Sequence, residues 1–292
     1  MKARNGMTKI GRIVLSVLAA AALSSAQEIS FKLMGGLTLV QGDDYNRGAD
    51  GALRLLRDSS SSVTGDFGRF RSGMNFQGEI ITHWGRRIAV GLGGGMYEIG
   101  SESRVTSRTA GVDGPFTADT LLKPKLSVLP FYLNLYYKIR LGPRVGLDVF
   151  AGPVFEVAQF SSNRQTTSSL NALVESETYR ASQIALGAQA GISLNVGIGR
   201  GMAFVADGFF RSAKAANFLG NWALNSSSST GTVTKSSAES YFWTYESTPG
   251  DHYPLAGFFD AAGPTGEGIS GARKAEINLS GLTMTAGLKL NF

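Results

Sequence analysis

Alternation of apolar and polar residues is the feature that most restricts what this chain can fold into. In the C-terminal segment from Ser280 to Phe292, every even position from Leu282 onward carries an apolar side chain. The odd positions carry Gly, Thr, Lys or Asn. Successive side chains of a β-strand point to opposite faces, so a strict period of two over this length predicts a strand with one apolar face.

The same alternation recurs in seven other segments. They span residues 29–40, 74–83, 88–97, 128–140, 145–157, 183–196 and 202–211. In the fourth of them the odd positions from Leu129 to Ile139 are apolar or aromatic, whereas Asn134, Lys138 and Arg140 lie on the other face. We therefore predict an all-β chain with eight strands, each long enough to cross a bilayer at a tilt.

The connectors between these strands alternate in length. Three are short, at 84–87, 141–144 and 197–201, and four are long, at 41–73, 98–127, 158–182 and 212–278. Transmembrane barrels combine short periplasmic turns with longer extracellular loops. The sequence thus predicts an eight-stranded antiparallel up-and-down transmembrane β-barrel. Four long extracellular loops are expected, the largest about 212–278, and both termini are expected in the periplasm.

A secreted soluble barrel, such as a lipocalin, would show the same alternation, and composition separates the two classes. The polar face of a soluble barrel meets water and is usually rich in Lys and Glu. Here that face is mainly Gly, Ser, Thr, Asn and Gln with a few charges of both signs, and the chain contains 38 Gly. This composition favours a narrow barrel lumen inside a membrane.

The N-terminus has the order of a cleavable secretory signal. Lys2, Arg4, Lys9 and Arg12 precede an uncharged run from Ile13 to Leu23 and the small residues up to Ala26. That run is too short to span a bilayer as a helix, so we predict a signal peptide at 1–26 and a barrel domain at 27–292. The signal holds four of the 28 basic residues and no acidic one, so its removal lowers the formal net charge from +6 to +2. A nucleic-acid partner is therefore not predicted.

The last strand carries a resemblance to a known family. A terminal Phe292 preceded by apolar residues at alternate positions resembles the assembly signal of outer-membrane β-barrels, although Leu290 stands where the family often has Tyr. Over residues 27–292 the chain resembles the outer-membrane protein A type. The resemblance implies an integral outer-membrane protein that contacts outer-membrane lipid and lipopolysaccharide. It also implies recognition by the barrel assembly machinery through the C-terminal strand.

The resemblance carries over no catalytic residue, so we expect a non-enzymatic protein. A structural or surface-interaction role through the extracellular loops, with an unidentified partner, is the first hypothesis. A small passive porin-like channel is the second, and an outer-membrane lipid-modifying enzyme is the third. The largest loop is rich in aromatic residues, which predicts that it packs over the barrel mouth or binds a partner. They are Trp222, Tyr241, Phe242, Trp243, Tyr245, Tyr253, Phe258 and Phe259.

Only two histidines are available for acid–base chemistry. His83 lies beside the short turn 84–87, at the predicted periplasmic rim, whereas lipid-modifying barrel enzymes work from the outer leaflet or outer surface. His252 lies in the largest loop near Ser247 and Asp251, but a Ser-His-Asp relay is recognised by geometry and not by closeness in sequence. We predict no catalytic residue.

Two further segments resemble ligand loops but depart from their patterns. The cluster Asp43–Gly51 is rich in Asp, Asn and Gly, yet Ala49 and Leu55 stand where a calcium-binding EF-hand loop needs Gly and Glu. An ordinary turn is the better interpretation. The glycines of 91–95 lack the following helix and the Lys-Ser/Thr pair of a phosphate loop. No metal site and no cofactor are predicted.

Strand register gives the most detailed predictions. If the turn after the fourth strand is three residues long, 142–144, Lys138 lies opposite Asp148, Tyr136 opposite Phe150 and Asn134 opposite Gly152. A parallel argument places Gln77 over Gly93 and Glu79 over Gly91. Pro130 and Pro153, which cannot donate a ladder hydrogen bond, predict a bulge at each site. Eight strands enclose only enough space for side chains, so the lumen should be closed by packed polar groups.

Overall fold

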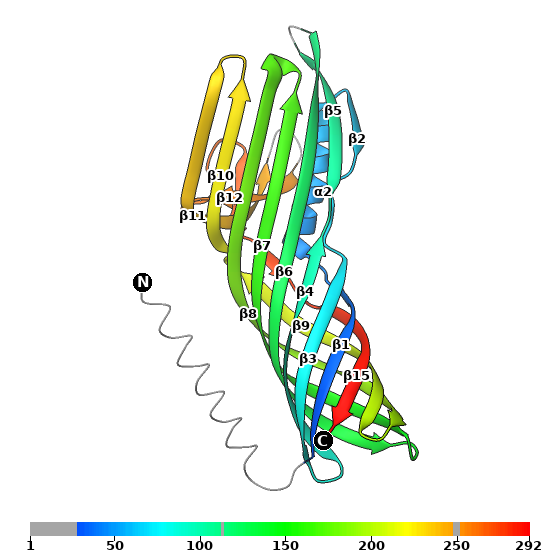
Figure 1. Ribbon diagram of the computed structural model, residues 1–292. Helices are drawn as coiled ribbons and strands as arrows, with labels where there is room; N and C mark the ends of the chain where they lie inside the picture. Colours follow the sequence, from blue (N-terminus) through cyan, green and yellow to red (C-terminus); the bar gives the residue numbers. More distant parts are fainter. Residues whose placement is uncertain (1–27, 112–113, 248–251) are drawn as a thin grey trace.

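The computed structural model describes residues 28–292 except 112–113 and 248–251, and the predicted signal at 1–26 lies outside the described residues. The described chain forms fifteen β-strands joined by antiparallel pairing, the helix α2 (Asp43–Ser59) and the short 3₁₀ helix η1 (Leu170–Ala172). Figure 1 shows how the longer strands and α2 are arranged. The sequence predicts eight strands, and the described residues contain seven more.

Eight of the strands pair in a closed circuit, which we call the ring. They are β1 (Ile29–Leu39), β3 (Ser72–Trp84), β4 (Ile88–Gly100), β6 (Gly114–Arg140), β7 (Val145–Ser168), β8 (Leu173–Gly199), β9 (Met202–Ala216) and β15 (Gly281–Asn291). Each pairs with the next in this order, and β15 pairs with β1, always antiparallel. The eight segments predicted from alternation fall on these strands to within one residue at either end, and β6, β7, β8 and β9 extend well beyond the predicted segments.

The two faces of the ring differ as the alternation predicts. On β6 the odd positions from Leu129 to Ile139 are exposed, whereas Tyr132, Asn134 and Tyr136 are buried inside. On β1 the exposed residues include Leu33 and Leu37, while Ser30, Lys32 and Thr38 are buried. An exposed apolar exterior around a buried polar interior is the pattern of a barrel whose outer surface meets lipid.

The exposed apolar side chains on the outside of the ring stop at a common level on β6, β7 and β8. We call the apolar outer surface up to this level the belt. Leu129 pairs with Val157, which pairs with Ile184. The next row of outward-facing residues, on the side away from the short turns, is polar. In that row Ser127 pairs with Gln159, which pairs with Ser182. The three strands continue well beyond this row, as the tall sheet in Figure 1 shows. We call this side the extended end, and the side with the three short turns the turn end.

The segments predicted as long loops contain all seven additional strands. These are β2 (Ser62–Gly65), β5 (Ser103–Gly111), β10 (Leu219–Ser228), β11 (Gly231–Ser247), β12 (Tyr253–Phe259), β13 (Ile269–Lys274) and β14 (Glu276–Asn278). Several of their sequences are rich in Ser and Thr, so the alternation of hydrophobicity fades although strands persist. Thr, Val and aromatic residues still favour the extended backbone there.

Helix α2 (Asp43–Ser59) corrects the interpretation of Asp43–Gly51 as a turn. Asp43 and Asp44 lie in its first turn and Arg57 in its last, where each charge complements the helix dipole. Tyr45, Ala49, Ala52, Leu53 and Leu56 recur at helical spacing on one side. The Asp, Asn and Gly residues of this segment also favour turns, so composition alone does not distinguish a turn from a helix here.

The predicted bulges at Pro130 and Pro153 are absent from the described strands. Pro130 pairs with Glu156 and Pro153 with Ala188, and the register is the same on both sides of each proline. Instead, pairing between β4 and β6 is interrupted next to Pro130, and pairing between β6 and β7 is interrupted next to Pro153. Each missing N–H donor therefore leaves a short gap in one ladder without inserting a residue.

The predicted register between β6 and β7 is confirmed, whereas the predicted register between β3 and β4 is wrong by two residues. Lys138 pairs with Asp148 and Tyr136 with Phe150, as a three-residue turn requires. Between β3 and β4, however, Gln77 pairs with Gly95 and Glu79 with Gly93. The turn there is 85–87, beginning at Gly85 with φ of 74°, a conformation that favours glycine, so Trp84 pairs with Ile88.

Candidate functional site

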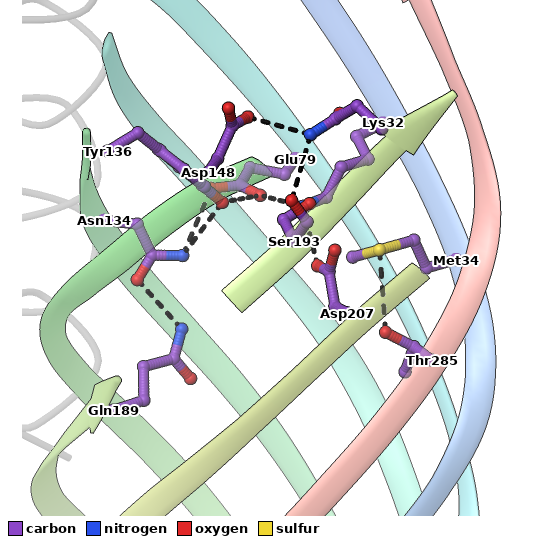
Figure 2. Close-up of polar contacts among 11 residues, drawn as sticks. Lys32, Met34, Glu79, Asn134, Tyr136, Asp148, Gln189, Ser193, Asp207 and Thr285 are labelled. Atoms are coloured by element: carbon purple, nitrogen blue, oxygen red, sulfur yellow. Dashed lines mark hydrogen bonds and ion pairs between the residues drawn. The ribbon is translucent and has the colours of Figure 1, made fainter. Parts of the chain in front are cut away.

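The centre of the ring is filled by buried charged residues. Lys32 of β1 donates a hydrogen bond to Asp207 of β9 at 2.7 Å, and its Nζ lies 3.5 Å from Glu79 of β3. The Glu79 carboxylate also accepts hydrogen bonds from the Tyr136 hydroxyl at 2.7 and 2.8 Å and from Asn134 at 3.2 Å. Figure 2 shows these side chains converging inside the ring. The buried charges are thus compensated by ion pairs and hydrogen bonds, as burial requires.

A second cluster continues this one toward the extended end. Gln189 of β8 donates to Asn134 at 3.0 Å and accepts from Arg211 of β9 at 3.3 and 3.4 Å. Arg211 donates to Glu156 of β7 at 3.0 Å, and the Tyr97 hydroxyl donates to the same carboxylate at 3.3 Å. We call the combined set the lumen network: Lys32, Glu79, Tyr97, Asn134, Tyr136, Glu156, Gln189, Asp207 and Arg211. It joins seven of the eight ring strands.

Beyond the network, the extended end is closed by an apolar core. Phe160 of β7 stacks on Phe242 of β11 and on Phe258 of β12, with ring centroids 5.4 and 5.8 Å apart. Tyr45 of α2 stacks on Phe70 at 4.3 Å and joins the same cluster. Burial raises the pKa of the Tyr45 phenol, since its ionised form would lose hydration. Part of the aromatic-rich segment 212–278 thus packs over the ring, one of its two predicted roles.

Helix α2 is held in that end by close packing and by ion pairs. A Cβ added at Gly51 would lie 1.7 Å from the Pro254 carbonyl oxygen of β12, so only glycine permits this approach. The Asp44 carboxylate accepts two hydrogen bonds from Arg273 at 2.7 and 2.8 Å and one from the backbone N–H of Glu276 at 2.8 Å. The Asp44 hydrogen bond raises the pKa of Arg273.

The turn end, in contrast, holds a cavity of about 1540 Å³. We call it the vestibule. Two acidic residues, Glu28 and Asp148, contribute to its lining. Seven basic residues line it as well: Arg86, Arg87, Lys138, Arg140, Arg144, Arg200 and Lys289. The vestibule is therefore strongly cationic.

Lys138 and Asp148 face this interior on paired positions, as predicted, but they are not in direct contact. Lys138 instead contacts His83, while Asp148 accepts a hydrogen bond from Asn195 at 3.0 Å. The register predicts which residues lie opposite each other on β6 and β7, but the side-chain contacts of Lys138 and Asp148 are made with residues of other strands. Similarly, Glu79 pairs with Gly93 along the ladder, yet its carboxylate lies over Gly91, where an added Cβ would come within 2.0 Å of it.

His83 lies beside a serine, but the hydrogen-bond directions oppose a catalytic role. Its Nε2 lies 2.6 Å from the Ser30 hydroxyl, and its Nδ1 contacts the Lys138 ammonium. An ammonium group only donates, so Nδ1 accepts and the ring proton is on Nε2. A base that activates Ser30 would need a free electron pair on Nε2 instead. The Ser30 hydroxyl in turn donates to Asn291 at 2.7 Å.

The other candidates are not brought together into a catalytic site. His252 is exposed at the extended end, and its Nδ1 lies 3.2 Å from Glu246. The described residues show no hydrogen bond between His252 and Ser247, and Asp251 lies outside the described residues. Within the described part of the chain, no three His, Cys, Asp or Glu residues are placed to hold a metal ion. The described helices include none that is long and apolar enough to cross a bilayer.

Sequence reasoning missed how the lumen residues pair. The alternation puts Lys32, Glu156, Asp207 and Arg211 on the polar faces of their strands. It does not predict that Lys32 pairs with Asp207 and Arg211 with Glu156, because each of these pairs joins strands that are not adjacent in the ring. The sequence nevertheless contains a signal for ion pairs inside the ring, because these charged residues lie in strands whose other face is apolar. Such residues have to find partners across the interior.

Comparison with known proteins agrees with this architecture. Residues 11–207 match the model of the outer membrane protein beta-barrel domain. The chain therefore belongs to that family, and it is an outer-membrane protein. No curated protein matches the sequence.

Three solved structures align over most of the chain, each at 12% identity. A major outer membrane protein of Thermus thermophilus covers 92% of this chain and 100% of its own, with a TM-score of 0.37. OprG of Pseudomonas aeruginosa covers 91% and 96%, with a TM-score of 0.36. The outer membrane protease OmpT of Escherichia coli covers 92% and 98%, with a TM-score of 0.29.

Proposed function

We propose that this protein is a non-enzymatic integral outer-membrane protein whose ring is an eight-stranded transmembrane β-barrel with a closed lumen. It acts in structural or surface interactions through its extended end. The observation that carries this proposal is the combination of an exposed apolar belt outside and a continuous buried network inside. Lipid accommodates the first, and the second leaves no room for a conducting path.

The proposed orientation in the membrane rests on the contrast between the short turns at one end of the ring and the long strands at the other. The turn end and both termini face the periplasm, and the extended end projects from the cell. The segment 1–26 directs export, and the last strand ending at Phe292 is recognised by the barrel assembly machinery. Arg180 and Lys125 face outward just beyond the belt, where lipopolysaccharide phosphates would lie.

The closed interior disfavours the porin-like alternative, and the arrangement of the histidines disfavours an enzyme. A solute would have to pass both the lumen network and the apolar core around Phe160. His83 cannot act as the base for Ser30 as it is hydrogen-bonded, and His252 contacts a carboxylate on an exposed surface. The exposed Ser- and Thr-rich sheet at the extended end is left as the surface available to an extracellular partner.

Single-cysteine labelling tests the orientation, since the chain contains no cysteine. Ser229→Cys places a thiol in the exposed β10–β11 turn, and Arg86→Cys places one in an exposed turn at the turn end. A membrane-impermeant maleimide should label Ser229→Cys on intact cells and Arg86→Cys only after the outer membrane is permeabilised. Equal labelling of both on intact cells, or recovery of the protein in the soluble fraction, would contradict the proposal.

A further inference from the structure

The basic residues of the vestibule differ from the other buried or clustered cations of this protein. Lys32 and Arg211 pair with carboxylates in the lumen, and Arg69, Arg164 and Arg273 pair with carboxylates at the extended end. By contrast, none of the seven vestibule cations lies within ion-pair distance of a carboxylate in the described part of the chain. Only two carboxylates, those of Glu28 and Asp148, line the vestibule beside these seven cations, so most of the positive charge has no carboxylate counterpart there.

The shape of the vestibule favours binding over passage. Lys138 and Lys289 lie on the inner face of the ring, and Arg86, Arg144 and Arg200 lie in the three short turns around the opening. Further inward, the space is filled by a packed layer. That layer consists of Ile81, Ala89, Tyr136, Phe150 and Phe209. The vestibule is thus a blind, positively charged pocket that opens at the turn end.

Like charges collected in one concave site repel one another and concentrate counter-ions there. A ligand with several negative groups would relieve that repulsion at several cations at once. Arginine suits phosphate and carboxylate groups, because its guanidinium can donate two parallel hydrogen bonds to either. The cavity also has more than enough volume for a small ligand.

We propose that the vestibule is a binding site for an oxyanion that carries several phosphate or carboxylate groups. Lys138 and Lys289 contact the ligand in the interior, and the arginines of the turns contact it at the opening. The site lies at the opposite end from the surface in the proposed function and is independent of it. The ligand is either a soluble anion of the compartment at the turn end or the headgroup of an anionic phospholipid.

Calorimetric titration of the full-length protein in phosphatidylcholine nanodiscs with inorganic tripolyphosphate tests this site. Wild type should bind saturably. Lys138→Met/Lys289→Met should weaken binding about tenfold or more, because two nearby charges are lost. Arg144→Gln/Arg200→Gln alters only exposed turns and should weaken binding as well, which keeps the test valid if the inner variant folds poorly.

The matched control removes two exposed cations at the other end of the molecule that have no carboxylate partner among the described residues. Arg104→Gln/Arg108→Gln on β5 causes the same change in net charge and should leave the affinity within about twofold. No saturable binding by wild type, or equal weakening by the control and vestibule variants, would overturn the proposal. Nanodiscs containing phosphatidylglycerol separate the two sources. If phosphatidylglycerol in the nanodisc lowers the affinity for tripolyphosphate, the ligand is a lipid headgroup. If the affinity for tripolyphosphate is unchanged, the ligand is a soluble anion.

Discussion

Replacing Arg211 with Met is the sharpest perturbation of the lumen network. Arg211 is 1% exposed and donates to Glu156, whose side chain is fully buried. Its guanidinium also lies 5.4 Å from the centroid of the Tyr97 ring and donates twice to Gln189. Met fills a similar space but supplies neither charge nor donor. The variant therefore leaves the Glu156 carboxylate buried without its cation.

The expected loss is about 3–5 kcal/mol of unfolding free energy, the usual consequence of removing one partner of a buried ion pair. Guanidinium unfolding of the protein in lipid vesicles, followed by fluorescence of its three tryptophans, measures this loss. Arg180→Met is the matched control, because Arg180 is exposed on the outward face of β8. The control should change stability by less than about 0.5 kcal/mol.

A double-mutant cycle separates the ion pair from general packing. Glu156→Met in the Arg211→Met background removes the uncompensated charge and should recover about 2 kcal/mol. The recovery is incomplete, since Tyr97 and Gln189 lose their partners as well. The reasoning is refuted if Arg211→Met costs less than about 1 kcal/mol, or if adding Glu156→Met lowers stability further by the full single-variant amount.

Three further changes test the extended end. Gly51→Val should cost about 1–3 kcal/mol and speed proteolysis within α2, because the added side chain meets the Pro254 carbonyl, whereas Arg54→Val at an exposed position of α2 should cost less than about 1 kcal/mol. Arg273→Gln should cost only about 1 kcal/mol in the same unfolding assay, since Arg273 is half exposed and Asp44 keeps a backbone donor. His252→Ala should leave the acyl number of lipid A unchanged by mass spectrometry, whereas a changed acyl number would revive the enzyme hypothesis.

The strands that form the ring were predictable from the sequence because period two fixes which residues share a face. The faces of β1, β6 and β15 follow directly from it. Register depended in addition on turn length, which was inferred correctly for 142–144 and incorrectly at Gly85. A turn's length depends on a few backbone torsions, and a shift of two residues preserves every face, so alternation alone cannot detect the error.

The contents of the lumen were less predictable. Partners such as Arg211 and Glu156 are 55 residues apart in sequence, and their contact depends on the closure of the whole ring. Helix α2 was missed because its Asp, Asn and Gly residues also suit a turn, and the close approach that needs Gly51 exists only once β12 is in place. The vestibule is formed by three separate turns and became visible only in three dimensions.

Single-channel current recording of the wild-type protein in planar lipid bilayers tests the closed lumen most directly. With the interior filled by the lumen network and the apolar core, we expect the current to stay at the baseline of the bare membrane across the applied voltages. Steady, reproducible open-channel steps on the order of a nanosiemens, which a water-filled barrel would give, would contradict the account.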